Sequence, residues 1–85
     1  MMDEIDVKIL AAVNKVSPKL FVSPVKVNEV LRLNETELGD RLMLLNKSGH
    51  LDIITGEYSS SLTLPNLITK VYLTDFGRQS LKETR

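Results

Sequence analysis

The amino-acid sequence predicts a single α+β domain over residues 1–85, with three helices, an antiparallel β-hairpin and a C-terminal helix. Three observations indicate this order. Apolar residues recur at helical spacing in three early segments, two later segments alternate polar and apolar residues as strands do, and a capped helical pattern ends the chain. A chain of 85 residues can enclose one modest core, so we expect no second domain.

The charge of the chain is balanced. Eleven lysines and arginines stand against eleven aspartates and glutamates, so the formal net charge is zero. A protein that is dedicated to duplex DNA usually carries a basic excess, so this balance weakens a nucleic-acid function. The chain has no cysteine, which excludes disulfides and thiolate metal sites and fits a reducing compartment. The apolar runs are too short to cross a membrane, and we expect a cytoplasmic protein.

Catalytic chemistry is not expected. The single histidine, His50, has no cysteine and no second histidine with which to form a metal cluster or an activated nucleophile. Asp3 and Asp6 resemble a pair of catalytic acids, but they lie at a helix start, where the helix dipole favours carboxylates. No glycine-rich phosphate loop is present. We therefore expect neither enzyme activity nor a cofactor or metal.

The first helix is predicted from "DEIDVKILAAVNKV", in which Ile5, Ile9, Val13 and Val16 recur at helical spacing. Asp3 offers a cap or a first-turn carboxylate, and the proline of "SPKLFVSP" ends the helix near Val16. Residues 20–22 of that segment are β-prone and long enough for one edge strand.

A short second helix is predicted at "SPVKVNEVLRL". Ser23 can cap this helix while Pro24 takes its first position, where a missing N–H does no harm. Val27, Val30 and Leu31 would then form its apolar face.

A third helix is predicted over residues 34–48. Asn34 and Glu37 form a capping-box pattern at its start, and Gly49 supplies a left-handed stop. The spacing of Leu38, Leu42 and Leu45 directs these leucines into the core. The opposite face then carries Thr36, Asp40, Met43 and Lys47, with Glu37 and Leu44 on one flank. We expect Leu44 to pack under the hairpin.

The hairpin is predicted from "LDIITGEY" and "LITKVYLT", two alternating segments joined by the long connection "SSSLTLPN". The connection is rich in leucine, with Leu62, Leu64 and Leu67 around Pro65. Such a tip either folds back on the body or docks a partner, and we expect it to fold back. The three serines at 59–61 could donate to phosphate, but a soluble linker is the simpler interpretation.

A fourth helix is predicted at "DFGRQSLKETR". Thr74 stands before this segment and can cap it, and Phe76 and Leu81 would anchor it to the core.

This element order is that of a winged helix-turn-helix domain, a three-helix core with a two- or three-stranded wing and a C-terminal helix. "DEIDVKIL" resembles the first helix of Lrp-type regulators, and "VYLTDFGRQSL" resembles the segment that closes the wing in MarR and PadR regulators. "LLNKSGHL" is similar to the end of a winged-helix third helix. The size and the Leu-Thr-x-x-Gly ending also resemble the YjcQ-type group of small, phage-associated winged-helix proteins.

The resemblance implies a DNA-binding transcriptional regulator in which helix 34–48 enters the major groove of double-stranded DNA. The residues that would meet bases or phosphates are Lys26, Arg32, Thr36, Asp40, Arg41, Met43, Lys47 and Lys70. Glu35 and Gly39 would also face the groove. The three carboxylates Glu35, Glu37 and Asp40 resist this function, because they repel phosphates. The two glutamates alternatively complement the helix dipole, and an ion pair with Glu37 is the alternative role for Arg41.

The alternative function is a protein-interaction module. Winged helices also bind proteins, and the acidic, methionine-bearing face of helix 34–48 and the leucine-rich wing suit such a partner. The fold is also consistent with a homodimer formed through the first helix, the last helix or the wing. A basic surface around helix 34–48 would favour DNA, whereas a neutral or negative one favours the protein partner.

Overall fold

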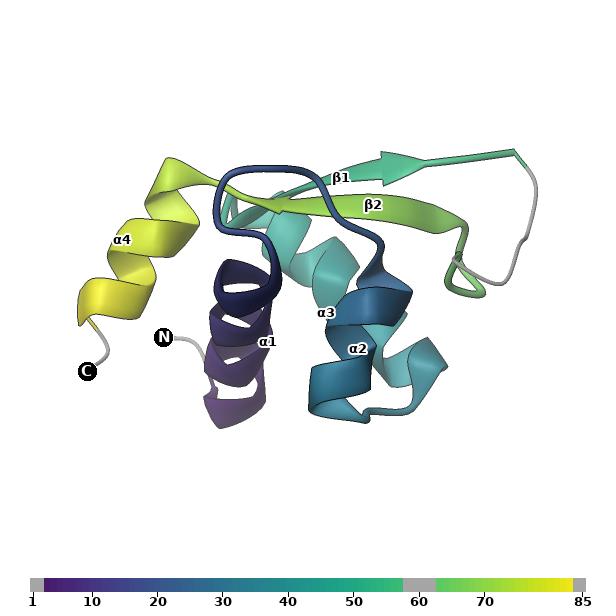
Figure 1. Cartoon of the computed structure of the whole chain (residues 1–85), viewed down its shortest axis with the longest axis horizontal. Helices are drawn as coiled ribbons and strands as arrows, with labels where there is room; N and C mark the ends of the chain where they lie inside the picture. The colour runs from purple at the N-terminus through teal and green to yellow at the C-terminus, as the bar shows by residue number, and fades with distance from the viewer. Residues whose placement is uncertain (1–2, 58–62, 84–85) are drawn as a thin grey trace.

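The computed structural model describes residues 3–57 and 63–83 and contains four helices and one two-stranded antiparallel sheet in that part of the chain. The elements are α1 (Glu4–Val16), α2 (Pro24–Leu31), α3 (Glu35–Lys47), β1 (Leu51–Thr55), β2 (Ile68–Leu73) and α4 (Asp75–Glu83). The first three helices pack beneath the hairpin, and α4 lies beside α1 at the other end from α2 (Figure 1). The predicted α+β class and element order are therefore confirmed.

Side chains cap the first two helices where the sequence predicts them. The Asp3 carboxylate accepts a hydrogen bond from the Asp6 backbone N–H at 2.9 Å. The Ser23 hydroxyl accepts one from the N–H of Val25 at 3.2 Å, and Pro24 takes the first position of α2. Each cap satisfies a backbone donor that the helix itself leaves without a partner.

The third helix is also bounded as predicted. The Asn34 side chain accepts hydrogen bonds from the N–H groups of Thr36 and Glu37, at 2.9 and 3.2 Å. At the other end Gly49 has a φ of 86°, a left-handed conformation that a side chain would strain. These caps fix where α3 begins and ends, and therefore which of its side chains point outward.

A side-chain clamp holds the turn between α2 and α3. Asn28 donates from Nδ2 to the Leu33 carbonyl at 2.8 Å, and its Oδ1 accepts from the Leu33 N–H at 2.9 Å. Arg32, within the loop so closed, takes a left-handed φ of 57°. The asparagine therefore replaces the backbone partners that the chain loses in this turn.

The core lies between the hairpin and the inner faces of α1, α2 and α3. Leu38, Leu42 and Leu45 are at most 3% exposed, which confirms their predicted inward direction. The other fully or nearly fully buried hydrophobic residues are Ile9, Leu10, Ala12, Val13, Val27, Leu51, Leu64, Ile68, Val71 and Leu73.

The hairpin pairs Leu51 with Leu73 at its base and Thr55 with Ile68 at its far end, with an irregularity after Ile54. The predicted edge strand at 20–22 shrinks to one bridge, in which Val22 exchanges two backbone hydrogen bonds with Val71 at 2.9 and 2.8 Å. The prediction of a strand was wrong for Leu20 and Phe21. Neither residue pairs with β2, and both side chains are exposed.

The connection of the hairpin folds back on the body, as expected, at Leu64. This side chain is completely buried, and its backbone N–H donates to the Ile68 carbonyl at 3.2 Å. Leu67 closes the turn with a left-handed φ of 67°. Ser59, Ser60, Ser61 and Leu62 lie outside the described residues.

Four apolar residues that the sequence assigns to packed faces are instead exposed. They are Val16 at 37%, Val30 at 50%, Leu44 at 64% and Phe76 at 55%. Val16 and Val30 stand at the edge of the stripes that their helices bury, where no element covers them completely. Leu44 lies on the flank of α3 beside Asp3 and Asp6 at the start of α1, and does not pack under the hairpin.

The last helix, α4, packs closely against the rest of the domain at a glycine. A Cβ at Gly77 would overlap the backbone oxygen of His50, so only glycine allows this approach. Leu81 packs against the core, as predicted, and Thr74 caps the helix by accepting from the Gly77 N–H at 3.0 Å. Phe76, one residue before this contact, therefore points out and packs on the ring of His50, at a centroid distance of 4.5 Å.

Candidate functional site

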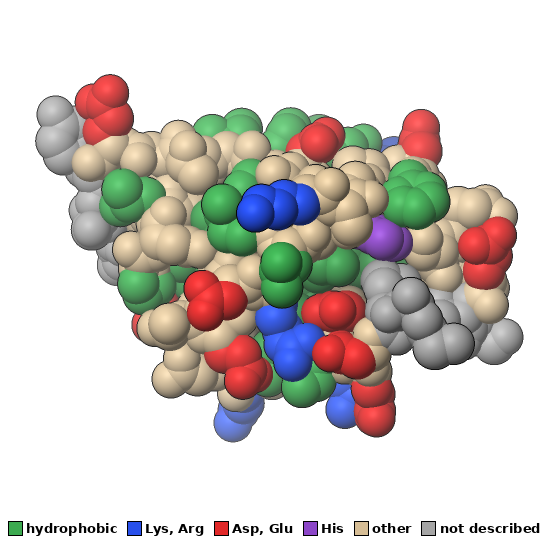
Figure 2. All heavy atoms as spheres, turned by 180° about the vertical axis from the view of Figure 1, so that it is seen from behind, with side chains coloured by type: hydrophobic (Ala, Val, Ile, Leu, Met, Phe, Trp, Pro, Cys, Tyr) green, Lys and Arg blue, Asp and Glu red, His purple; other side chains and the backbone are tan. Residues whose placement is uncertain are grey.

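The outward side of α3 is the candidate site, because the fold leaves it uncovered. We use "α3 face" for its exposed residues Glu35, Thr36, Glu37, Asp40, Met43, Leu44 and Lys47. Figure 2 views the molecule from the side of this helix and shows acidic side chains gathered around a basic one. The core leucines on the opposite side of α3 fix this orientation.

The one arginine of α3 reaches from the flank of this face to the start of α1. Arg41 donates from Nη1 to both carboxylate oxygens of Asp3, at 3.1 and 2.8 Å, and to Asp6 Oδ1 at 3.1 Å. Its side chain is only 24% exposed. The ion pair predicted with Glu37 is replaced by this one, because two carboxylates at the helix start offer more acceptors than one on the same helix.

The same contact changes the ionisation of both partners. The hydrogen bond from Arg41, helped by the backbone N–H of Asp6, holds the pKa of Asp3 below its ordinary value. Hydrogen bonds to Asp3 and Asp6 in turn raise the pKa of Arg41. The guanidinium therefore stays charged, but two carboxylates already neutralise it.

A shallow groove of about 600 Å³ runs between α3 and the start of α1. Its lining consists of Asp3, Asp6, Asn34, Thr36, Glu37, Asp40, Arg41 and Leu44. Among these residues are four carboxylates and one cation, so a bound partner would meet negative charge beside one large apolar side chain. Sequence reasoning missed the contribution of α1, because its two carboxylates are far from α3 along the chain.

The other cations named from the sequence are spread over separate elements. Lys26 lies in the first turn of α2, Arg32 in the turn before α3, Lys47 at the end of α3 and Lys70 within β2. Within the described residues none of the four forms an ion pair, and all four are exposed. Lys47 is therefore the only free cation on the α3 face itself.

The connection of the hairpin covers a part of α3 that the sequence was expected to place in the groove of DNA. A Cβ at Gly39 would lie 2.6 Å from Nδ2 of Asn66, so the connection of the hairpin packs directly on this glycine. Gly39 is buried, and the expectation that it would face a nucleic acid was wrong. Met43, one helical turn further, remains 39% exposed.

The described residues hold no group of three or more histidine, aspartate or glutamate side chains that could bind a metal ion. His50 lies between α3 and β1, and its Nδ1 is 2.6 Å from the Ser48 hydroxyl. In the same part of the chain, none of the helices is both long and apolar enough for a membrane span.

Comparison with known proteins identifies the fold. A crystal structure of a mutant of MarR from E. coli is similar to this chain, with a TM-score of 0.73 and 17% sequence identity. The match covers 96% of this chain and 54% of MarR, so the chain spans about half the length of that protein. No protein-family model and no curated protein sequence matches the chain. The chain is thus a winged helix that resembles MarR, which confirms the predicted fold class.

Proposed function

We propose that this chain is a winged-helix module of the transcription-regulator type whose α3 face binds a protein partner in place of a DNA groove. The fold supports the first part, because the resemblance to MarR extends over nearly the whole chain. The engagement of Arg41 by Asp3 and Asp6 supports the second, because two carboxylates neutralise the one arginine of α3.

The charge around α3 makes a poor match for a duplex. Five carboxylates and two cations lie on the α3 face and beside it: Asp3, Asp6, Glu35, Glu37, Asp40, Arg41 and Lys47. A protein gains affinity for DNA by placing cations near phosphates, and each carboxylate there acts in the opposite direction. The segment that would have to enter the major groove therefore repels the backbone on either side of it.

The apolar residues of the α3 face suit a protein better. Leu44 is 64% exposed and Met43 is 39% exposed, and both stand beside Asp40. A large apolar side chain with a polar and charged surrounding is the common arrangement at protein interfaces, and methionine adapts to partners of different shape. We infer a partner surface that offers an apolar pocket together with basic groups.

Duplex DNA is the second candidate, and the resemblance to MarR favours it. In this mode α3 would read bases, and the contacts would come from Lys26, Arg32, Thr36, Asp40, Arg41, Met43, Lys47 and Lys70. Arg41 would then have to leave Asp3 and Asp6 for phosphate. In either mode we place the protein in the cytoplasm, assign it no enzyme activity, and expect it to form a homodimer.

The experiment is site-specific photo-crosslinking in the cell that produces the chain. A photoreactive amino acid at position 44 should capture one protein, and the same amino acid at position 8, on the exposed side of α1, should not. The purified partner should bind the Asp40→Lys variant at least tenfold more weakly than the wild-type chain, because the variant repels its basic groups. Crosslinks from position 44 to DNA, or equal binding by the variant, would refute the proposal.

A further inference from the structure

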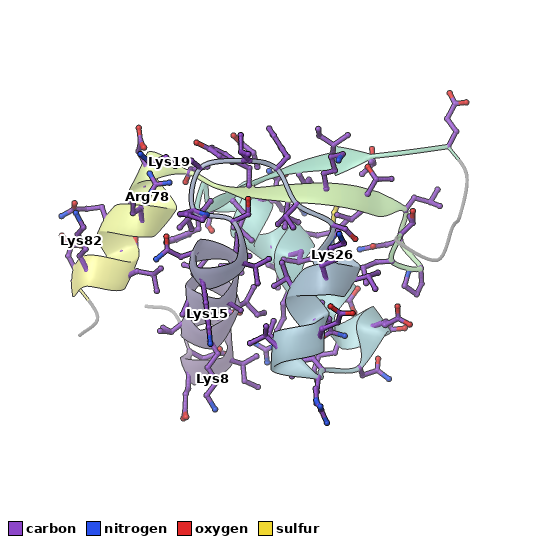
Figure 3. The ribbon with its side chains drawn as sticks, viewed as in Figure 1. Lys8, Lys15, Lys19, Lys26, Arg78 and Lys82 are labelled. Carbon is purple, nitrogen blue, oxygen red and sulfur yellow. The ribbon has the colours of Figure 1, made fainter. Side chains whose placement is uncertain are left out.

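Five of the eleven basic side chains of this neutral chain lie on α1, on α4 and in the loop after α1, away from α3. We use "basic face" for Lys8 and Lys15 of α1, Lys19 of the following loop, and Arg78 and Lys82 of α4. Figure 3 shows all five in the view of Figure 1, in which α1 and α4 are in front and α3 lies behind. Four acidic residues lie on the same two helices, Glu4 and Asp6 on α1 and Asp75 and Glu83 on α4. Asp6 pairs with Arg41 of α3, so the five cations leave this side of the molecule with an excess of positive charge.

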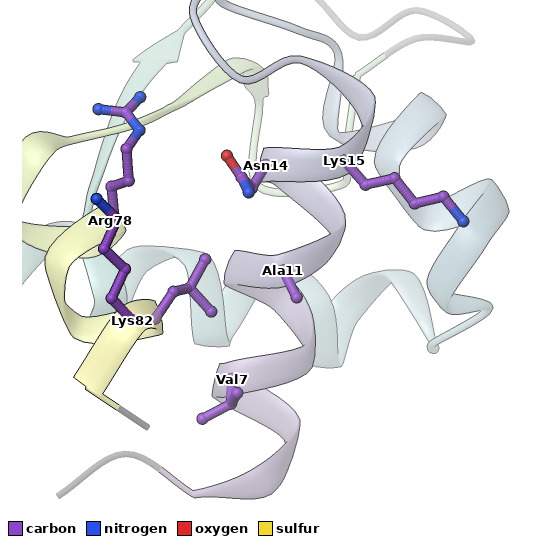
Figure 4. A pocket seen from close by; sticks show the side chains of 7 residues that line it. Val7, Ala11, Asn14, Lys15, Arg78 and Lys82 are labelled. Atoms are coloured by element: carbon purple, nitrogen blue, oxygen red, sulfur yellow. The ribbon is translucent and has the colours of Figure 1, made fainter. Parts of the chain in front are cut away.

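Helical spacing makes this face continuous. Lys8, Ala11 and Lys15 follow one exposed stripe of α1, and Arg78 and Lys82 are four residues apart on α4. Ala11 and Lys15 of the α1 stripe and both cations of the α4 stripe line a groove of about 460 Å³, which Val7 and Leu81 also line. Figure 4 shows the α4 cations on one side of this groove.

The far side of the groove is formed by α1. Asn14 presents a side-chain amide there, beside the methyl group of Ala11 (Figure 4). An amide can donate to a phosphate oxygen, and a methyl group lets a nucleic-acid backbone approach the helix closely.

Two of the five cations have carboxylate partners, and the side chain of Arg78 is only 29% exposed. Arg78 donates to Asp75 Oδ1 at 2.9 Å and to the Pro18 carbonyl at 2.6 Å, which holds the guanidinium against the loop after α1. Lys8 lies 3.5 Å from Glu4, in an exposed pair that contributes little and is readily exchanged. Within the described residues Lys15, Lys19 and Lys82 form no ion pair.

From this cluster of cations we propose that the basic face binds the phosphate backbone of nucleic acid, without reading its sequence. Several cations on one rigid surface attract a polyanion and release its counterions. The carboxylates of the α3 face lie on another side and do not oppose this approach. The proposal does not depend on the protein partner of α3, since a different surface carries it.

A lipid surface fits the basic face less well. Helices that lie on membranes insert a row of large apolar side chains between their cations. Between Lys8 and Lys15 the exposed stripe of α1 offers only the methyl group of Ala11, and Leu81 is partly buried against the core. The exposed apolar side chains nearest to this face, Leu20 and Phe21, lie in the loop after α1 and not in a row on a helix. The face therefore fits phosphates better than a bilayer.

The test measures binding of a fluorescent, random-sequence DNA duplex to the whole chain by anisotropy, between about 50 and about 200 mM salt. The double variant Lys15→Glu, Lys82→Glu should bind at least tenfold more weakly than wild type. Its plot of log K against log salt should be shallower by about 2, because two phosphate contacts are lost.

The matched control is Lys47→Glu, Lys70→Glu, which makes the same change of charge outside the basic face and should lose less than threefold. Circular dichroism and light scattering confirm that the variants fold and that their self-association equals that of the wild type. Equal losses for the two pairs, no wild-type binding at about 50 mM salt, or binding to anionic vesicles without binding to the duplex would each overturn the proposal. Loss of the α3 partner with duplex binding intact would refute only the function proposed for α3.

Discussion

Arg41 reaches the carboxylate of Asp3 across 38 residues of sequence, with its Nη1 at 2.8 Å from Oδ2 and 3.1 Å from Oδ1. Asp3 is at the same time the cap of α1. One carboxylate therefore begins the first helix and fixes the arginine of the third. This contact joins the middle of α3 to the start of α1 and neutralises the arginine beside the α3 face.

The first prediction concerns the dependence of stability on pH. The pKa of Asp3 is lowered in the folded chain, so the contribution of its ion pair is complete above the ordinary aspartate pKa of about 3.9 and is lost as pH falls through the lower folded-state value. Asp3→Asn keeps a capping side chain but removes the charge. We expect it to lower the melting temperature at neutral pH and to match the wild type at about pH 2.

Thermal unfolding followed by circular dichroism at both pH values measures this difference. Asp40→Asn is the control, because Asp40 is an exposed carboxylate with no ion pair within the described residues. A difference between Asp3→Asn and wild type that is the same at both pH values would mean that capping geometry, and not the ion pair, is responsible.

The second prediction compares two leucines of α3 that are two positions apart. Leu42 is 1% exposed and Leu44 is 64% exposed. Leu42→Ala should lower the free energy of unfolding by about 2–5 kcal/mol, because it leaves a cavity in the core. Leu44→Ala should change it by less than about 0.5 kcal/mol. Urea denaturation measures both values, and equal losses would contradict the orientation of α3.

The third prediction compares two buried glycines. A Cβ at Gly77 would overlap the backbone oxygen of His50, which cannot move without shifting the start of β1, so Gly77→Ala should destabilise the fold by about 2 kcal/mol or more. A Cβ at Gly39 meets only the side chain of Asn66, which can rotate. Gly39→Ala should therefore cost less, since alanine also favours the helix by up to about 1 kcal/mol. Melting curves of the two variants test the order, and a Gly77→Ala variant as stable as wild type would contradict the docking of α4.

The sequence predicts those parts of the fold whose causes are local. The caps Asp3, Ser23, Asn34 and Thr74 lie beside the helices that they begin, and the periodicity of each segment selects its buried stripe. These features depend on residues a few positions apart, so they can be identified without knowing how the elements pack.

Other features depend on which elements meet, and the sequence does not predict them. Phe76 was expected to anchor α4, but the close approach of Gly77 to His50 turns the ring outward. Leu44 and Arg41 meet the start of α1 on one flank of α3, and only the packed structure reveals that contact. The basic face arises in the same way, because cations from α1, α4 and the loop after α1 come together in space.

The most direct test of the central claim is an NMR titration of the ¹⁵N-labelled chain with a random-sequence duplex at about 50 mM salt. Our account predicts shifts at the amides of Lys8, Lys15 and Lys82, with little change from Thr36 to Lys47. Shifts concentrated in α3, with α1 and α4 unchanged, would contradict it and would mean that the acidic helix reads DNA after all.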